Sequence, residues 1–375
     1  MRYIFLSFVS MKTINAGAYN IHIGENIFTE MNKLLRSTEF KNSKLFVLAD
    51  ENSLKYCYPL LLKSVVRIKK AEIIEIESGE VNKNIEVCRN IWLTLSELHA
   101  DRKSVLINLG GGVIGDMGGF AAATFKRGIS FINVPTTLLS QVDASVGGKL
   151  GIDLNKLKNE IGVFGNPEAV FVYPPFLRTL PYREYLSGYA EIIKHALIAD
   201  KNYLNEIFTN GLQPPSSTEL ENIITHSIAI KNKIVKNDPI EKGLRKILNF
   251  GHTIGHALET YSFETDKIFH LLHGEAIIAG MICEAYLSVK KAGLPKDELK
   301  EITSFLLEIY KPINFNKFDE MRLIELMKHD KKNTKGEINF TLLNSIGKAA
   351  FDKKCSIQLI KESLRYYREE AKLKS

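Results

Sequence analysis

The sequence predicts an α/β domain followed by a domain built of helices, and three observations carry this prediction. Apolar runs of strand length alternate with helical periodicity up to about residue 180, which is typical of a mainly parallel sheet with helices on both faces. Beyond that point strand signals almost disappear while helical periodicity continues. A length of 375 residues also exceeds that of one ordinary domain. We therefore expect one domain at residues 11–180 and a second at residues 181–375.

Strands are expected only in the first domain, apart from one small hairpin in the second. The strand predictions cover residues 19–24, 44–50, 71–76, 104–109, 128–134 and 169–172, with helices at 53–68, at 84–99 and after the strand at 104–109. The helix predictions of the second domain cover residues 183–199, 217–236, 251–261, 274–291, 296–309 and 319–329, with a hairpin around 337–343 and a charged helix after Lys361. Residues 1–10 are expected to be an unstructured extension before a second possible start at Met11, because their apolar run is too short for a signal peptide.

Composition narrows the class of protein. The apolar fraction of 45% and the charged fraction of 25% are ordinary for a globular protein. A net charge of +7 is modest, and no block of lysines and arginines with interleaved aromatics occurs, which disfavours nucleic acid and favours an anionic small substrate. No apolar run is long enough to cross a membrane. The four cysteines are widely spaced and include no C-x-x-C, so we expect neither a disulfide framework nor a thiolate zinc site, and a cytoplasmic location fits.

A glycine-rich turn between a strand and a helix organises the first domain. Gly110, Gly112 and Gly115 match the pattern G-x-G-x-x-G. Without Cβ atoms, the backbone N–H groups of such a turn can approach a phosphate, and the positive end of the next helix points to the same place. No acidic residue follows about 20 positions later, as an ordinary dinucleotide fingerprint requires. We expect a Rossmann-like site for a nucleotide pyrophosphate in a non-standard frame, and the alternative is a tight turn without a ligand.

Two further stretches of the first domain have the composition of a ligand-binding surface. The strand at 128–134 ends in Pro-Thr-Thr, which places the hydroxyls of Thr136 and Thr137 where open α/β sheets hold ligands. Residues 141–149 and 158–162 are rich in Gly, Lys and Asp and lack apolar periodicity. Such segments are more often binding surfaces than connectors.

The second domain carries a set of potential metal ligands. His252 and His256 lie four apart on one helix face, and His273 opens the next apolar helix. Glu191 lies upstream on another helix, three residues before Lys194. Two histidines and one carboxylate from separate helices would form a three-ligand catalytic zinc site with one open position.

The residues alone leave the ligand set open between the three histidines and a set with the carboxylate. Glycines at 251, 255 and 274 indicate close approach of another group to this set. The absence of H-E-x-x-H excludes the protease arrangement, and we expect His99, His226 and His329 to be ordinary surface or core residues.

Several cations lie near these motifs in the sequence. Lys194, Lys231 and Arg245 are in the helical half, and Arg245 precedes His252 by seven residues, about two helical turns if the helix continued. On solvent-facing helices they would be ordinary charges. Together with Lys149 and Lys158 they could instead converge on phosphate and carboxylate groups.

These motifs together resemble the 3-dehydroquinate synthase family. The resemblance covers nearly the whole chain after Met11, and the motifs follow the family's order and approximate spacing at 110–119, 135–137, 141–149, 158–159, 248–256 and 273–275. The resemblance implies an N-terminal dinucleotide-binding α/β domain, a C-terminal helical domain and an active site in the cleft between them. It also implies a homodimer, because Arg127 matches a family arginine that reaches the neighbouring subunit's site.

The resemblance assigns roles residue by residue. A metal ion, usually zinc and sometimes cobalt, is implied at Glu191, His252 and His273. NAD contacts are implied for Asp50, Glu80, Lys83, Gly111, Gly112, Val113, Asp116, Thr136, Thr137, Lys149, Lys158 and Thr179. Substrate contacts are implied for Asp143, Lys149, Asn159, Lys194, Lys231, Arg245, Asn249 and His256, with residues 330–332 near the substrate.

Two departures from the family pattern are visible. The interval between His252 and His273 is a few residues longer than expected, around 261–269, and includes an extra His270. Asp238 and Pro239 stand where the family usually has an acidic pair.

The implied substrate is 3-deoxy-D-arabino-heptulosonate 7-phosphate, an acid of the shikimate pathway. NAD⁺ transiently oxidises its C5 alcohol, phosphate is eliminated, the hydride returns, and an intramolecular aldol reaction closes the ring, so the lyase reaction has no net redox change. The nearest alternative is a sister sugar-phosphate cyclase that lacks the carboxylate-bearing substrate. A metal- and NAD-dependent polyol or glycerol phosphate dehydrogenase would release net NADH, and a non-catalytic nucleotide-binding module would turn nothing over.

Overall fold

The structure, a computed structural model, describes residues 11–154, 157–210, 217–265, 269–315, 318–329 and 338–373. Contacts divide the chain into two compact units, Met1–Pro181 with Ser216–Asn232, and Tyr182–Pro215 with Lys233–Ser375. The sequence prediction put all of residues 181–375 in the second domain, so the grouping of Ser216–Asn232 with the first unit is a correction.

Polar contacts explain why this segment groups with the first unit. Lys12 Nζ donates to Asn222 Oδ1 over 2.5 Å, and Asn232 Nδ2 donates to the carbonyl of Asn15 over 3.0 Å. Lys12 and Asn15 are the two end residues of a strand that the sequence did not predict. Helical periodicity reports that a segment is a helix, but it does not report which sheet the helix packs against.

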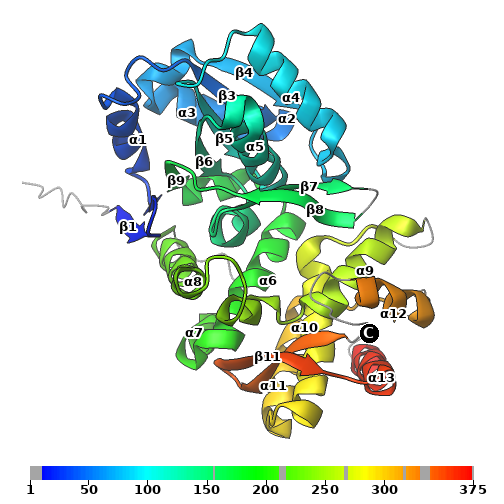
Figure 1. Cartoon of the computed structure of the whole chain (residues 1–375). Helices are drawn as coiled ribbons and strands as arrows, with labels where there is room; N and C mark the ends of the chain where they lie inside the picture. Colours follow the sequence, from blue (N-terminus) through cyan, green and yellow to red (C-terminus); the bar gives the residue numbers. More distant parts are fainter. Residues whose placement is uncertain are drawn as a thin grey trace, which may run out of the picture. The chain divides into compact units, whose positions relative to one another are not determined.

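A seven-stranded sheet forms the centre of the first unit, in the order β1-β2-β9-β6-β5-β3-β4 (Figure 1). Its strands are β1 (Lys12–Asn15), β2 (Asn20–Ile23), β3 (Leu45–Asp50), β4 (Glu72–Ile76), β5 (Val105–Gly110), β6 (Ser130–Pro135) and β9 (Ala169–Val172). Among the described strands of this sheet, β1 pairs antiparallel with β2 and every other pair is parallel. The prediction of a mainly parallel sheet is confirmed.

Helices cover both faces of this sheet, and a core lies on each side. On one face α1 (Ile27–Arg36) and α3 (Tyr58–Ser64) pack against strand residues such as Val47 and Ile107. On the other face α4 (Ile85–Glu97) and α5 (Gly112–Thr124) pack against Leu48 and Leu106. The alternating inward and outward side chains of buried parallel strands fill both cores.

The helix predicted at 53–68 is divided. The structure has α2 (Glu51–Tyr56), α3 (Tyr58–Ser64) and the 3₁₀ turn η1 (Val66–Lys70) in its place. Pro59 in the first turn of α3 is the physical reason, because proline has no N–H to donate to the preceding turn.

A short antiparallel sheet lies outside the main one. It consists of β7 (Lys149–Leu154) and β8 (Leu157–Phe164), and β7 packs against α5. A Cβ atom on Gly151 would lie 2.7 Å from the carbonyl oxygen of Ile161 on the neighbouring strand. The sequence did not predict these strands, because glycines that permit close backbone approach also weaken the strand signal.

The second unit is mainly helical, as predicted, and α10 (His273–Lys291) lies at its centre. Of the α10 residues, nearly all from Gly274 to Ser288 are buried, and they pack against α6 (Tyr182–Ala199), α9 (His252–Glu264), α11 (Lys296–Ile309) and α13 (Ile357–Leu373). The remaining helices are α7 (Lys201–Asn210), which was not predicted, the end of α8 (Ser217–Asn237), and α12 (Glu320–His329).

A hairpin is present in the second unit, but it extends beyond the predicted 337–343: that stretch overlaps β10 (Asn339–Ser345) alone, and the second strand is β11 (Lys348–Lys354). Glu337, residues 330–332 and residues 1–10 lie outside the described residues. Within the described part of the chain, no helix combines the length and the hydropathy needed to cross a membrane.

Candidate active site

The glycine turn has the predicted strand–turn–helix form. Gly110 ends β5, Gly111 is the residue before the helix, and Gly112 begins α5. The backbone N–H of Thr136 donates to the carbonyl of Gly110 over 2.9 Å, and a Cβ atom on Gly111 would lie 3.2 Å from Thr137 Cγ2. The turn and the Pro-Thr-Thr segment therefore lie side by side at the carboxyl ends of β5 and β6, where the helix dipole favours an anion.

Gly118 and Gly119 of this motif serve packing. A Cβ atom on Gly118 would lie 2.2 Å from Asn108 Oδ1, and one on Gly119 would lie 2.4 Å from Leu150 Cδ2. Their absence of side chains lets α5 lie close to β5 and to β7. Gly115 has no atom within 4 Å of its Cβ position, so its role is not packing.

A charged cluster on the first unit brings together residues that the resemblance assigns to NAD and to substrate. Lys83 Nζ lies 2.6 Å from Asp116 Oδ2 and 2.6 Å from Asn159 Oδ1. Lys158 Nζ lies 3.2 Å from Glu80 Oε1. Burial lowers the pKa of Lys83, but Asp116 and Glu80 outweigh burial and the net shift is upward. Lys83 therefore stays charged, whereas burial raises the pKa of its partner Asp116.

Asp153 ties the hairpin to this cluster, and the sequence reasoning missed it. Its Oδ1 accepts the backbone N–H of Asn159 over 2.7 Å, and its own N–H donates to the carbonyl of Lys83 over 2.8 Å. Asn159 has a φ of +54°, a left-handed conformation that asparagine tolerates better than most residues. The available signal was Asp153 itself, an aspartate six residues before Asn159 in a glycine-rich stretch, where aspartate side chains often accept backbone N–H groups.

A second ion pair of the first unit joins two predicted substrate residues. The buried Lys231 donates from Nζ to Asp143 Oδ1 and to the carbonyl of Asp143, both over 2.6 Å. Lys149 is exposed at the start of β7. The structure brings Asp143 and Lys231 into contact. The predicted convergence of the cations on a substrate's acid groups stays a prediction.

Three further predicted residues of the first unit have local roles. Asp50 ends β3 and caps α2 by accepting the backbone N–H of Ser53 over 2.7 Å. Thr179 is exposed in the 3₁₀ turn η5 (Pro174–Thr179), and Val113 lies in the first turn of α5. Thr179 donates to the carbonyl of Phe176 over 3.3 Å, so the described contacts do not join it to the charged cluster.

Arg127 is exposed in an unusual backbone conformation. Lys126, Arg127 and Gly128 have φ angles of +50°, +71° and +113° in succession. Left-handed lysine and arginine cost about 1 kcal/mol or more each, and such conformations cluster at functional sites.

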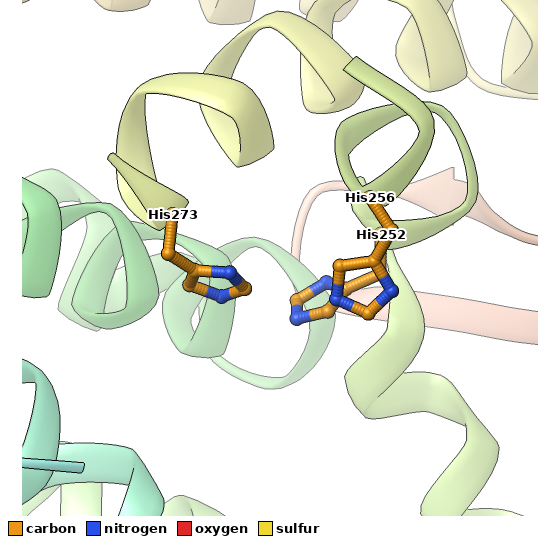
Figure 2. A group of neighbouring side chains, drawn as sticks. All are labelled: His252, His256 and His273. Atoms are coloured by element: carbon orange, nitrogen blue, oxygen red, sulfur yellow. The ribbon is translucent and has the colours of Figure 1, made fainter. Parts of the chain in front are cut away.

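The predicted metal ligands meet in the second unit, where Figure 2 shows the three imidazole rings facing one another. His252 opens α9 and His273 opens α10, and the Nε2 atom of each lies 3.6 Å from Glu191 Oε1 on α6. The His256 ring centroid lies 5.0 Å from that of His252 and 5.8 Å from that of His273. Glu191 is fully buried, and its Oε2 is ion-paired with Lys194.

The donor set fits a tetrahedral metal ion. Zinc bound at about 2.0–2.1 Å separates its ligand atoms by roughly 3.3 Å, close to the carboxylate–imidazole spacing here. His252 Nδ1 lies 3.1 Å from the carbonyl of Phe250 and His273 Nδ1 lies 3.2 Å from Glu259 Oε2. These contacts occupy the Nδ1 atoms. The Nε2 atom of each ring, which faces Glu191, is therefore the one that can bind a metal ion, with Nδ1 held by a neighbouring group as in most histidine–metal sites.

The carboxylates also set the charge of one histidine. Burial lowers the pKa of His273, but Glu259 and Glu191 outweigh it and raise the pKa to about 9. A metal ion at this place displaces that proton, because a histidine ligand must be neutral at the coordinating nitrogen.

The glycines flagged in the sequence allow close approach of helix backbone. A Cβ atom on Gly251 would lie 3.0 Å from the carbonyl oxygen of Ile277, and one on Gly274 would lie 2.2 Å from that of Ser187. Gly280, which the sequence reasoning missed, lies so close that its Cβ would be 2.0 Å from the Gly251 carbonyl oxygen. These contacts fix the spacing of α6, α9 and α10 and therefore the spacing of the ligands they carry.

Glu284 is a second residue that the sequence reasoning missed. It is fully buried on α10, and its carboxylate accepts the backbone N–H of Gly251 over 2.7 Å and that of Ile254 over 3.1 Å. It therefore caps the N-terminus of α9, the end that carries His252. One acidic residue inside the apolar run 276–287 was the available signal.

Arg245 and Asn249 lie on the 3₁₀ segment η6 (Leu244–Asn249) rather than on a continuous helix. Gly251 has a φ of +80° and interrupts the helical path, so the condition that the helix continues from Arg245 to His252 is not met. Arg245 is buried and donates to the carbonyl of Pro239 over 2.6 Å, and Asn249 donates to Glu241 Oε1 over 2.8 Å. The carboxylate of Asp238 accepts the backbone N–H of Arg245 over 3.0 Å. Asp238 and Pro239, which stand where the family usually has an acidic pair, therefore both bind Arg245.

Two family models match successive parts of the chain, the N-terminal model of 3-dehydroquinate synthase at residues 73–187 and the C-terminal model at residues 188–333. The chain belongs to the 3-dehydroquinate synthase family. It is 45% identical to the 3-dehydroquinate synthase of Parabacteroides distasonis, with 92% of this chain and 97% of the relative covered. It is 38% identical to that of Pelagibacter ubique, with 90% and 92% covered.

Solved structures of related synthases share the fold. A 2-deoxy-scyllo-inosose synthase complexed with carbaglucose-6-phosphate, NAD⁺ and Co²⁺ has 26% sequence identity and a TM-score of 0.83, with 95% of this chain and 99% of that chain covered. A 2-epi-5-epi-valiolone synthase from Streptomyces hygroscopicus, with NAD⁺ and Zn²⁺ bound, has 21% identity, a TM-score of 0.81 and coverages of 96% and 98%. A probable glycerol dehydrogenase from Sinorhizobium meliloti shares the fold at a TM-score of 0.57, 14% identity and coverages of 92% and 95%.

Proposed function

We propose that this chain converts 3-deoxy-D-arabino-heptulosonate 7-phosphate to 3-dehydroquinate and phosphate, with NAD and a divalent metal ion bound, as a homodimer in the cytoplasm. The observation that carries the proposal is the donor set of the buried Glu191 and His252 with the partly exposed His273, in a chain of this family. The metal, when bound, supplies Lewis-acid polarisation of the substrate's hydroxyl oxygens. Each of the following roles is part of this proposal.

The chain's own residues hold the metal ligands in place. Lys194 pairs with the far oxygen of Glu191, which leaves Oε1 directed toward the two Nε2 atoms. Glu259 and the Phe250 carbonyl fix the ring orientations of His273 and His252. Zinc and cobalt both suit two imidazoles and one carboxylate.

The glycine turn of the first unit is the proposed pyrophosphate site for NAD. Gly111, Gly112 and Val113 present backbone N–H groups at the start of α5, beside the hydroxyls of Thr136 and Thr137. NAD, when bound, supplies a hydride acceptor that is regenerated within each cycle. Asp50 at the end of β3, the charged cluster of Glu80, Lys83, Asp116 and Lys158, and Thr179 are assigned to the same cofactor.

Cationic and amide side chains are the proposed substrate ligands. Lys194 and Arg245 are both buried, so their charges are poorly screened and suit a phosphate or carboxylate. Lys149, Lys231, Asn159, Asn249, His256 and Asp143 complete the set. Their role is to orient the substrate and to hold its charges in place, which supplies much of the barrier reduction in such reactions.

Arg127 is proposed to act in the site of the neighbouring subunit. Its exposed side chain and left-handed backbone support a role outside its own fold. This assignment requires a homodimer, because Arg127 can reach the site of another subunit only when two copies of the chain associate.

A coupled assay tests the proposal. Zinc-loaded protein, catalytic NAD⁺ and 3-deoxy-D-arabino-heptulosonate 7-phosphate are mixed, and phosphate release and NADH absorbance are followed together. We expect phosphate over many turnovers without accumulation of NADH, and no phosphate from Glu191→Ala. Stoichiometric NADH would instead identify a dehydrogenase.

A sister sugar-phosphate cyclase is the second candidate, because the solved structures that match in fold include 2-deoxy-scyllo-inosose synthase. Phosphate release from glucose 6-phosphate, with none from the heptulosonate, would favour it. The buried Arg245 favours a substrate with an additional acid group.

A further inference from the structure

Arg183 connects two elements that carry proposed metal ligands. It is the second residue of α6, the helix that also carries Glu191. Its Nε and Nη2 atoms donate to the two carboxylate oxygens of Glu275, each over 2.7 Å. Glu275 is the third residue of α10, and that helix begins at His273. The pair therefore joins the two helices at a point two residues after His273 on α10 and about two helical turns before Glu191 on α6.

Arg183 also holds the segment that leads into α10. Its Nη2 atom donates to the carbonyl of His270 over 2.8 Å, and its guanidinium carbon lies 4.6 Å from the ring centroid of Phe269. Glu275 in turn accepts the backbone N–H of Leu272 over 2.8 Å. One guanidinium thus organises the described residues from Phe269 to Glu275, which follow the lengthened interval between the two histidine ligands.

A second link between the same helices lies one turn further along α6. The Ser187 hydroxyl accepts the backbone N–H of Gly274 over 2.9 Å, and Gly274 packs directly on the Ser187 backbone. The contacts of Ser187 set the distance between α6 and α10. The contacts of Arg183 set the rotation of the first turn of α10, because a bidentate pair restrains orientation as well as distance.

We infer that Arg183 is a positioning residue of the metal site, which orients His273 toward Glu191 by clamping the first turn of α10 onto α6. The inference rests on the proposed metal site. Without the clamp, the first turn of α10 loses its orienting contact and the metal is released faster. Arginine is required rather than lysine, because only a planar fork bonds both oxygens of Glu275 and the His270 carbonyl together.

A matched control is available in the same unit. Arg322 on α12 makes an equally bidentate pair with Glu264, over 2.9 and 2.6 Å, at the other end of α9 from His252. The side-chain exposures of the two pairs are nearly identical, 41% and 26% for Arg183 and Glu275 against 40% and 25% for Arg322 and Glu264. Removal of either arginine should change the stability of the metal-free protein by similar small amounts.

The test measures zinc release from full-length zinc-loaded protein into an excess of an absorbing chelator. We expect Arg183→Gln and Arg183→Lys to accelerate release about 10-fold or more, in the range typical of lost contacts around metal ligands. Glu275→Gln should match Arg183→Gln, and the double variant should be no faster than either. Arg322→Gln should release zinc at a rate within about twofold of the unchanged protein, since it removes only the surface pairs with Glu264 and Glu325, at the other end of α9 from His252.

Each other outcome separates this inference from the proposed function. Release from Arg183→Gln at the unchanged rate, or equal acceleration in Arg322→Gln, overturns the positioning role while the metal site stands. Failure of the unchanged protein to hold stoichiometric zinc overturns the proposed metal site and the inference with it. If Arg183→Gln does not fold, Glu275→Gln and Arg183→Lys give the same comparison.

Discussion

The charged cluster of the first unit and the proposed metal-ligand set of the second unit are built in different ways. The cluster around Lys83 is held by hydrogen bonds and ion pairs between side chains of a turn, the helix α5 and a hairpin. Of the proposed metal ligands, His252 and His273 open α9 and α10 and Glu191 lies in the middle of α6. The spacing of these helices is fixed by backbone contact at Gly251, Gly274 and Gly280. The first region therefore depends on charge and the second on shape, and substitutions should separate the two dependences.

The largest effect is expected from Gly280→Ala. A Cβ atom there would lie 2.0 Å from the carbonyl oxygen of Gly251, so α9 and α10 must move apart. We expect a loss of about 3 kcal/mol in the free energy of unfolding, at the upper end for overpacked cores, measured by urea titration. Gly115→Ala is the control, because nothing lies within 4 Å of that Cβ position. It should be neutral or stabilise by up to about 1 kcal/mol, and an equal loss in both variants would contradict the shape argument.

Zinc should stabilise the unchanged protein by the next largest amount. At free zinc about 100-fold above the dissociation constant, binding to the folded state adds roughly 2.7 kcal/mol to the free energy of unfolding. Glu191→Ala removes the carboxylate oxygen that faces both histidines, so it should abolish this increment and the activity together. Thermal unfolding with and without zinc measures the increment, and retention of stoichiometric zinc by Glu191→Ala would refute the ligand assignment.

A smaller effect on stability is expected from Lys83→Met. This change removes the cation between Asp116 and Asn159 and leaves the carboxylate partly buried, which should cost about 2 kcal/mol. NAD binding, measured by calorimetry, should weaken about 10-fold, equivalent to roughly 1.4 kcal/mol. Zinc stoichiometry should not change, because Lys83 and its partners belong to the first unit and the three proposed zinc ligands to the second. Loss of zinc in Lys83→Met would break that separation.

The smallest effect concerns the thiols. All four cysteines are buried, and burial raises the pKa of Cys57, Cys88 and Cys355 to about 12. Because the thiolate is the reactive form, the native protein should react with a disulfide reagent at pH 8 only on unfolding. In Gly280→Ala, Cys283 on the displaced helix should react before Cys57 and Cys88 of the first unit. Mass spectrometry of the labelled peptides measures this order, and simultaneous labelling would mean that the disturbance is not confined to α10.

Prediction from the sequence succeeded where periodicity or composition reports local structure. The strand, glycine turn and helix around Gly112 were found because apolar runs and glycine punctuation are local signals. The hairpin of β7 and β8 was not found, because Gly151 and Gly162 weaken the strand pattern while allowing close backbone pairing. The division of the predicted helix at 53–68 was missed because it depends on one residue, Pro59, within a pattern that is otherwise helical.

The site shows the same limit. Residue types and family motifs predicted a metal site at Glu191, His252 and His273, and the structure brings these three side chains together, while metal binding itself stays a prediction. Glu284, Glu259 and Arg183 were not identified, because their partners are backbone groups or side chains far away in the sequence. A residue that acts by holding another residue leaves no local pattern, and only the fold reveals its contact.

The two units are interleaved along the chain. The segment Ser216–Asn232 belongs to the first unit, although it follows α6 and α7 of the second unit in the sequence. During synthesis, the first 181 residues therefore leave the ribosome before the segment that supplies Lys231 to Asp143. A fragment that stops at Pro181 lacks that segment, and a fragment that starts at Tyr182 carries it without the sheet it belongs to. Complementation of two separately expressed pieces should thus succeed only when the break falls outside residues 182–232.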